Sequence, residues 1–280
     1  MMQINCKGQL IDFKTPKVMG VLNITPDSFY DGGKYKDLKQ LLQQTERMIT
    51  EGADFIDLGA YSSRPGATNI EISTEKKRLL PILEELIKEF PSTFYSIDTF
   101  RSEVAEEALA LGAALINDIS AGLLDLQMMK TVAKYKVPYV MMHMKGTPQT
   151  MKSLNQYSNL INDIKFYFSK QIQKARDFGI ADLIIDPGFG FAKDSLQNFK
   201  LLHDLDLLNS FDLPVLAGLS RKSMIYKNLN IDANKALNGT TVLNTIALTK
   251  GAKILRVHDV KEAKQAIHLH QLTISSYKSI

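Results

Sequence analysis

The segment ADLIIDPGFGFAK, residues 181–193, contains a short apolar run at 183–185 that ends in the acid Asp186. An apolar run of this length, without alternating polar residues, is typical of a strand that is buried on both faces. Pro187 and the glycines that follow it indicate a turn directly after the strand. The segment therefore predicts a buried strand that ends in a polar residue and opens into a loop.

The same arrangement recurs along the chain at intervals of roughly 20–45 residues. Eight apolar runs lie at 18–22, 55–58, 94–97, 115–116, 139–142, 183–185, 215–217 and 254–257. The segments between them place apolar residues at the spacing of amphipathic helices, and glycines often follow these segments. Strands that alternate with helices in this way predict an α/β fold, a (β/α)8 TIM barrel.

Two local signals modify this barrel. Residues 2–13 read as a short β-hairpin around Gly8 that plugs one barrel end. Pro81 predicts a kink or a boundary near the start of the helix at 79–90. Because no linker or low-complexity segment interrupts the 280 residues, residues 1–280 are expected to form a single domain.

The composition limits the class of protein. The formal net charge of +4 is mild, which argues against a nucleic-acid binder and suits anionic small substrates. Cys6 is the only cysteine, so no disulfide can form within the chain and a reducing compartment is expected. The N-terminus has no secretory pattern and no apolar run reaches 18 residues, so we expect a cytoplasmic protein without a membrane partner.

Polar side chains occur where every apolar run ends. In a TIM barrel the carboxyl ends of the strands meet at one rim, where the active sites of this fold lie. Three of these residues, Asp98, Asn117 and Asp186, offer acceptor oxygens. Such oxygens suit a flat heterocycle that presents several N–H donors on one edge.

A second group at the same rim carries donors. Asn23, Arg256 and His258 follow the first and last runs, which are neighbours in a closed barrel, and suit an anion such as a phosphate. Lys222 is a further cation between the two groups. The long loops after the first two runs are either lids or plain turns. The sequence thus predicts a site with acceptors on one side and cations on the other.

Motifs at these strand ends resemble those of the dihydropteroate synthases of folate biosynthesis. In chain order they are GVLNITPDSFYDGG (20–33), IDLGAYSSRPGAT (56–68), SIDTFR (96–101), INDISAG (116–122), MMHMKGTPQTM (141–151), IIDPGFGFAK (184–193), GLSRKS (218–223) and RVHDV (256–260). The resemblance extends from about residue 17 to 260. It implies a pterin-binding transferase that joins 6-hydroxymethyl-7,8-dihydropterin diphosphate to 4-aminobenzoate, releases pyrophosphate, uses Mg²⁺ and forms a homodimer through its late helices.

The resemblance also implies a role for individual residues. Those expected to bind the pterin are Asp98, Asn117, Met141, Asp186 and Lys222. Those expected at the diphosphate are Asn23, Ser63, Arg256 and His258, with Asn23 also a Mg²⁺ ligand. Those expected around the aminobenzoate are Ser63, Arg64, Pro65, Phe189, Lys222 and Ser223. The catalytic group is expected to be Asp31, Lys222, Arg256 and His258, with Phe29 and Asp31 on the first loop.

The chain departs from the family motif in the second loop. Tyr61 stands where Glu is usual, and Ser63 stands where Thr is usual. Serine keeps the hydroxyl, whereas Tyr61 is expected to pack at the base of the loop. Tyr30 also replaces a small polar residue. These departures leave the anion site intact and open a question about the role of Tyr61.

Two other readings of the motifs stay open at this stage. One is a folate- or corrinoid-linked methyltransferase, which shares the pterin-binding barrel but needs neither the SRPGA loop nor a diphosphate corner. The other is a non-catalytic pterin-binding homologue that has lost the loop or anion residues. His143 lies close enough to the predicted rim to contact a ligand or to pack structurally.

Overall fold

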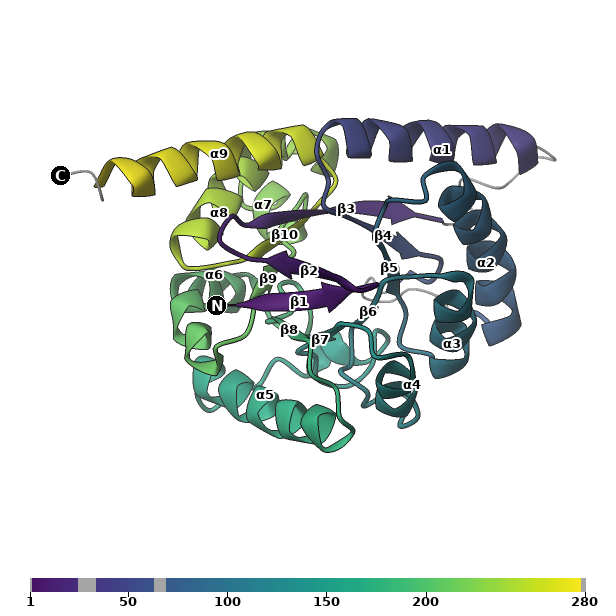
Figure 1. Ribbon diagram of the computed structural model, residues 1–280. Helices are drawn as coiled ribbons and strands as arrows, with labels where there is room; N and C mark the ends of the chain where they lie inside the picture. Colours follow the sequence, from purple (N-terminus) through teal and green to yellow (C-terminus); the bar gives the residue numbers. More distant parts are fainter. Residues whose placement is uncertain (1, 25–33, 63–68, 278–280) are drawn as a thin grey trace.

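The computed structural model describes residues 2–24, 34–62 and 69–277, and its parallel strands form a ring surrounded by helices (Figure 1). The strands are β3 (Lys17–Asn23), β4 (Phe55–Gly59), β5 (Tyr95–Asp98), β6 (Leu115–Asp118), β7 (Tyr139–Met142), β8 (Leu183–Asp186), β9 (Leu216–Ala217) and β10 (Ile254–Val257). Each overlaps one of the predicted apolar runs, with ends that differ by at most two residues. The prediction of a (β/α)8 barrel is therefore confirmed.

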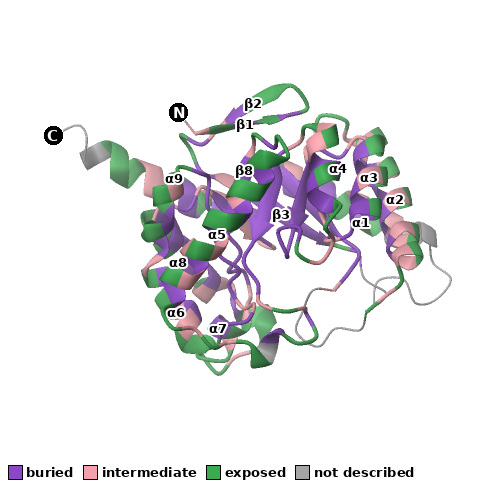
Figure 2. Cartoon of the chain, turned by 90° about the horizontal axis from the view of Figure 1, so that it is seen from below, coloured by how far each residue is buried: buried purple, intermediate pink, exposed green. Residues whose placement is uncertain are grey.

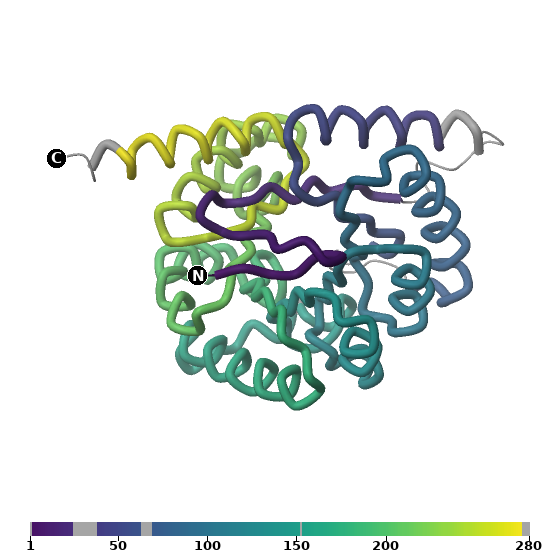
Figure 3. The backbone as a smooth tube through the Cα atoms, viewed as in Figure 1, coloured from purple at the N-terminus to yellow at the C-terminus, as the bar shows by residue number. Residues whose placement is uncertain are grey.

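The chain passes around the ring in sequence order, as the tube in Figure 3 shows. The hydrogen-bonded order is β8-β7-β6-β5-β4-β3-β10-β9, and every neighbouring pair in it is parallel. A single bridge between Ile185 and Val215 links β8 to the segment before β9 and nearly closes the ring. The carboxyl ends of all eight strands consequently lie at the same end of the barrel.

Helices cover the outside of the barrel. They are α1 (Lys34–Thr50), α2 (Ile72–Glu89), α3 (Ser102–Leu111), α4 (Met128–Tyr135), α5 (Leu160–Asp177), α6 (Ser195–His203), α7 (Ser223–Tyr226), α8 (Leu237–Thr249) and α9 (Val260–Tyr277). Gly112 ends α3 with a φ of 114°, a left-handed conformation that costs a glycine little. Within the described residues, no helix is long and apolar enough to cross a bilayer.

The prediction of a helix boundary at Pro81 is wrong. Helix α2 begins at Ile72 and continues through Pro81 to Glu89. Pro81 is exposed, so the backbone carbonyl that loses its partner one turn earlier lies on the face open to water. A proline on the solvent face is therefore tolerated inside this helix.

A hairpin closes the amino-terminal end of the barrel, as predicted. Strands β1 (Gln3–Cys6) and β2 (Gln9–Asp12) are antiparallel, and both turn residues, Lys7 and Gly8, have positive φ. The buried hairpin side chains are Ile4, Cys6, Ile11 and Phe13, and they pack on interior residues of the barrel strands such as Met19, Phe55 and Val140. Figure 2 shows the hairpin at one end of the buried strands and the loops at the other. The open end of the barrel is therefore the end that carries the loops.

Candidate active site

The barrel interior changes from apolar to polar along the strand direction. Beside the hairpin it is filled by apolar residues, and further along five of the strands the interior face carries polar residues. The polar side chains are Asp57 from β4, Asp98 from β5, Asn117 from β6, Asp186 from β8 and Arg256 from β10. Charged groups so deeply buried are costly unless they are paired, so their contacts are informative.

Arg256 connects two of these carboxylates. Its Nε donates to Oδ2 of Asp57 at 2.6 Å, and its Nη2 donates to Oδ2 of Asp98 at 2.7 Å. Asn117 adds a hydrogen bond from Nδ2 to Oδ2 of Asp57 at 3.0 Å. The other oxygen of Asp57, which is fully buried, accepts no hydrogen bond from the described residues. Arg256 is thus held in a fixed orientation by two acids, and the cluster retains acceptor capacity.

The charges in this cluster affect one another's pKa values. Burial raises the pKa of Asp98 to about 7, although Arg256 opposes the shift, and the charge of Asp57 adds to it. Burial alone would lower the pKa of Arg256, but Asp57 and Asp98 together hold it above the ordinary value. Arg256 therefore stays charged, and Asp98 titrates near neutral pH. Asp57 was not predicted as a site residue, although an acid inside an apolar strand indicates a buried polar partner.

Lys222 and Asp186 form the other side of the site. A Cβ added to Gly218 would lie 3.8 Å from Nζ of Lys222, 3.9 Å from Oδ2 of Asp186 and 4.0 Å from Cβ of Arg256. These three side chains therefore meet around one glycine. Burial raises the pKa of Asp186, with Lys222 as the main opposing influence. Burial lowers the pKa of Lys222 to about 8, which the charge of Asp186 counteracts.

The β8 loop, which we define as residues 187–193, contains two phenylalanines, of which only Phe189 was expected at the site. Phe189, expected beside the aminobenzoate, is fully buried in the core, and only its backbone carbonyl, which accepts a hydrogen bond from Nζ of Lys222, faces the site. Phe191 is only partly buried, and Nζ of Lys222 lies 5.1 Å from its ring centroid. The expectation that the Phe189 ring lines the site is therefore corrected, and Phe191 is the phenylalanine of this loop whose ring lies beside Lys222.

Met141 is also placed differently from the expectation. It belongs to the apolar cluster that joins the strands to the helices, together with outward-facing residues such as Ile185. Met142, the next residue, is opposite Asp186 in the β7–β8 register and belongs to a different cluster. Because successive strand side chains point to opposite faces, Met142 and not Met141 faces the barrel interior. The expectation that Met141 faces the site is therefore corrected, because Met142 is the methionine of β7 that faces the interior.

The donors at the last strand are positioned by hydrogen bonds. Nδ1 of His258 lies 3.1 Å from Oγ of Ser220, and the backbone N–H of His258 donates to the same oxygen at 3.2 Å. Asn23 is exposed at the end of β3, the strand that pairs with β10. Ser223 is exposed at the first residue of α7. The remaining expected residues, Phe29, Asp31, Ser63, Arg64 and Pro65, lie outside the described residues.

His143 lies in the core and not at the surface of the site. Its side chain is buried, its ring packs edge-on against Tyr167 at 4.8 Å between centroids, and Nδ1 lies 3.1 Å from Nζ of Lys193. Burial, followed by the charges of Lys193 and Lys145, lowers the pKa of His143 well below its ordinary value. His143 is thus neutral and structural in this arrangement.

Comparison with known proteins agrees with this geometry. Residues 19–258 match the pterin-binding enzyme family. The dihydropteroate synthase of Escherichia coli (strain K12) is 39% identical over 98% of both chains. The Yersinia pestis dihydropteroate synthase in complex with a sulfonamide drug is 40% identical, with a TM-score of 0.91 over 98% of this chain and 100% of that one. The Xanthomonas albilineans dihydropteroate synthase with 4-aminobenzoic acid is 36% identical, with a TM-score of 0.89 over 97% of each chain.

The chain belongs to the dihydropteroate synthases of the pterin-binding enzyme family. It is therefore a transferase of folate biosynthesis with a pterin-binding barrel. The sequence motifs at the strand ends extend over residues 20–260, and the family match extends over residues 19–258.

Tyr61, which departs from the motif of these dihydropteroate synthases, packs at the base of the second loop as expected. Its ring meets Phe100 edge-on at 5.0 Å, and the Arg101 guanidinium lies 5.1 Å from its centroid. Its hydroxyl donates to Oδ1 of Asn69 at 3.3 Å and accepts from Nε2 of Gln149 at 3.1 Å. Tyr61 thus connects the loops that follow β4, β5 and β7.

The described part of the enzyme holds no group of three or more His, Cys, Asp or Glu side chains arranged to bind a metal ion. The expected ligand, Asn23, offers a single exposed amide oxygen. One protein oxygen at an open position fits a Mg²⁺ ion that is held mainly by substrate phosphates and water. It does not fit a metal centre built from the protein alone.

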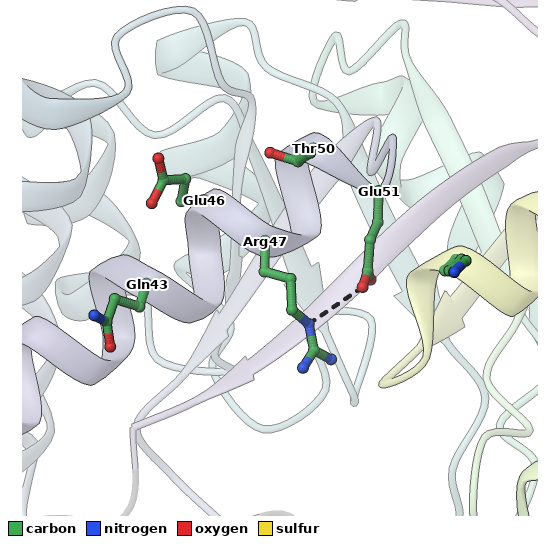
Figure 4. A pocket seen from close by; sticks show the side chains of 6 residues that line it. Gln43, Glu46, Arg47, Thr50 and Glu51 are labelled. Carbon is green, nitrogen blue, oxygen red and sulfur yellow. Dashed lines mark ion pairs between the residues drawn. The ribbon is translucent and has the colours of Figure 1, made fainter.

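A shallow hollow on the outer surface lies between α1 and the start of α9 (Figure 4). It is lined by Gln43, Glu46, Arg47, Thr50, Glu51 and Lys261, which belong to α1, the residue after it and α9. Arg47 and Glu51 form an ion pair across one helical turn at 3.2 Å. Such a pair is ordinary on a solvated helix face, and we assign no function to this hollow.

Proposed function

We propose that this enzyme condenses 6-hydroxymethyl-7,8-dihydropterin diphosphate with 4-aminobenzoate to give 7,8-dihydropteroate and pyrophosphate. The observation that carries the proposal is that acceptors and cations meet at one end of one barrel, with Asp186, Lys222 and Arg256 around Gly218. The acceptors match the amino edge of a pterin, and the cations match its diphosphate tail.

The pterin ring binds to the acceptor side of the site in this proposal. Asp186 accepts two hydrogen bonds from the 2-amino group and the adjacent ring N–H, Asn117 and Asp98 bind further ring atoms, and Lys222 donates to the ring. Burial of Asp186 and Asn117 supports this assignment, because buried partners discriminate strongly between ligands that satisfy them and ligands that do not. Met142 lines the same interior.

The diphosphate binds to the donor corner. His258, Asn23 and Ser63 contact its oxygens together with Arg256. The two carboxylates bind Nε and Nη2 of Arg256 and so hold its guanidinium in a fixed orientation. Nη1 has no acceptor among the described residues, which supports its donation to the diphosphate. Those same acids reduce the net positive charge of the corner. We therefore infer that Arg256 contributes most when negative charge develops on the leaving oxygen.

The aminobenzoate binds beside the pterin methylene group. Ser63, Arg64 and Pro65 from the second loop and Ser223 from the first turn of α7 surround it in this proposal. Phe191 replaces Phe189 as the aromatic wall, since the Phe191 ring is partly exposed and lies under Lys222. An aniline nitrogen is already neutral at pH 7, so the reaction needs no strong base in the site.

The chemical step in this proposal is dissociative. The bond between the pterin methylene carbon and the diphosphate oxygen breaks first, and the electron pair leaves with the oxygen. The electron-rich dihydropterin stabilises the resulting cation, with Asp31 as an added negative charge. The aniline nitrogen then attacks and loses its proton. Arg256 and His258 stabilise the leaving anion, and Lys222 holds the ring in line.

Asn23 would hold Mg²⁺ together with the diphosphate oxygens. The ion, when bound, would neutralise part of the charge of the leaving group. The exposed position of Asn23 supports this role, because the ion could enter and leave with the substrate.

We also propose that residues 1–280 act as one domain, that the enzyme works in the cytoplasm and that two copies associate. The lone buried Cys6 supports a reducing compartment. Helices α8 and α9 pack together and carry exposed apolar side chains, including Val242, Ile246, Leu269 and Leu272. Apolar side chains gathered on neighbouring helices favour a protein partner.

The test is incubation with both substrates and Mg²⁺, followed by measurement of pyrophosphate and of dihydropteroate by mass. We expect equal amounts of both products and none when 4-aminobenzoate is omitted. Pterin binding without product would favour a non-catalytic relative. Transfer of a methyl group from a methylated folate would favour the methyltransferase reading.

A further inference from the structure

Lys193, the buried last residue of the β8 loop, was not predicted as a site residue, and its ammonium group bonds back to earlier residues of the same loop. Nζ of Lys193 donates to the backbone carbonyl oxygens of Gly188 and Phe191, both at 3.0 Å, and lies 3.1 Å from Nδ1 of His143. An ammonium group has three donors, and this arrangement uses all of them if His143 accepts. A neutral His143 with its proton on Nε2 is the form that accepts at Nδ1.

Further contacts fix the β8 loop around this ammonium group. The Tyr157 hydroxyl donates to the backbone carbonyl of Ala192 at 2.9 Å, and the Gly190 N–H donates to Oδ1 of Asn198 at 2.7 Å. A Cβ added to Gly188 would lie only 2.1 Å from the carbonyl oxygen of His143. The backbone at Gly188 therefore packs directly against the residue that follows β7, and the Lys193 side chain is buried.

The loop reaches the site through Asp186. The Gly188 N–H donates to Oδ1 of Asp186 at 2.7 Å, and the Gly188 carbonyl accepts from Lys193. On the opposite side of the loop Lys222 donates to the carbonyl of Phe189. The β8 loop thus presents carbonyls to two cations, Lys222 inside the site and Lys193 behind it.

We propose that Lys193 is a positioning residue that keeps the Asp186 carboxylate ionised and correctly oriented for the pterin amino edge. Lys193 acts through its charge and through the backbone of Gly188, whose C=O accepts from Lys193 and whose N–H donates to Asp186, and it does not contact the substrate. The inference rests on the proposed function, in which Asp186 binds the pterin.

The charges around Lys193 set the direction of the pH effect. Burial lowers the pKa of Lys193 to about 7, the charge of Asp186 raises it, and Lys222 and Lys145 lower it further. His143, which faces the same ammonium group, has its own pKa lowered by burial. In return Lys193 is one of the cations that oppose the raised pKa of Asp186. Removing that charge should therefore allow Asp186 to take up a proton at higher pH.

The experiment compares Lys193→Met with Lys193→Arg, which keeps the charge. The affinity for a pterin without the diphosphate is measured by calorimetry from pH 5 to pH 9, and turnover is measured by pyrophosphate release. For Lys193→Met we expect the acid limb of the affinity profile to move up by about one pH unit, the size of shift produced by a nearby charge. That corresponds to about tenfold weaker binding on the acid side. Lys193→Arg should keep the wild-type acid limb.

The outcomes separate this inference from the proposed function. If wild-type enzyme does not bind the pterin, the proposed function fails. If it binds and Lys193→Met has the same acid limb, the lysine is merely structural and the inference is overturned, even when affinity falls uniformly. Should Lys193→Met not fold, Lys193→Gln, which keeps a donor and has no charge, carries the same expectation. The ionisation of the pterin itself is common to all variants and cancels in the comparison.

Discussion

Replacing Asp186 with Asn tests the acceptor side of the site. Asn keeps one oxygen for the Gly188 N–H, which now bonds at 2.7 Å, and places amide hydrogens where the pterin donors are expected. Two charge-assisted hydrogen bonds are then lost, each worth about 1.5–3 kcal/mol. The sum of at least about 3 kcal/mol corresponds to a dissociation constant that is more than about a hundredfold weaker. Calorimetric titration with a pterin without the diphosphate measures this change directly.

The control is Asp118→Asn. Asp118 is also a buried acid at a strand end, but it accepts hydrogen bonds from Ser120, Gly122 and Tyr139 behind the barrel wall. We expect Asp118→Asn to lower stability by about 1–3 kcal/mol and to leave pterin affinity within twofold. Unchanged affinity in Asp186→Asn, or an equal loss in both variants, would refute the assignment of Asp186.

Asp186→Asn should also reveal how pH acts on stability. Because burial raises the pKa of Asp186, the folded state holds that proton more tightly than the unfolded state. The stability contributed by the protonated Asp186 carboxyl group is therefore lost as pH rises from its ordinary pKa through the raised pKa. Asn does not titrate, so the Asp186→Asn variant should lack this pH dependence. At pH 7 we expect an unfolding temperature no more than about 4 °C below wild type, so lost binding will not reflect unfolding.

Three further variants or conditions probe the rest of the site. Arg256→Ala should reduce turnover far more than affinity for a diphosphate-free pterin. It should also cost about 3–5 kcal/mol of stability, because Asp57 and Asp98 lose their shared cation. Adding Asp57→Asn to this variant should recover part of the lost stability in chemical denaturation, and no recovery would contradict the pairing. Gly188→Ala should destabilise the folded protein by several kcal/mol, because the new Cβ would lie 2.1 Å from a backbone oxygen. The control Gly179→Ala, with similar φ and nothing within 4 Å of its Cβ, should cost only about 1–2 kcal/mol. Equal melting temperatures for the two variants would exclude the clash. Chelation of Mg²⁺ should stop pyrophosphate release without changing the affinity for a diphosphate-free pterin, and a parallel loss of both would assign the ion to the pterin side.

The strands and most helices could be predicted from sequence because their signals are local. An apolar run such as 183–185 needs only its own residues to indicate a strand buried on both faces. The left-handed glycine after α3 and the Lys7–Gly8 turn of the hairpin are likewise local features. The carboxylate at the end of β8 was recognised as a site residue for the same reason.

The tertiary structure alone decided which polar groups meet and which side each faces. Arg256 and Asp57 are 199 residues apart, so no short pattern indicates that they share a hydrogen bond. Met141 and Met142 look equivalent as letters, but strand pairing turns only Met142 toward the interior. Periodicity is a property of neighbouring residues, whereas the facing direction of a side chain and the partner of a charge depend on how the barrel closes.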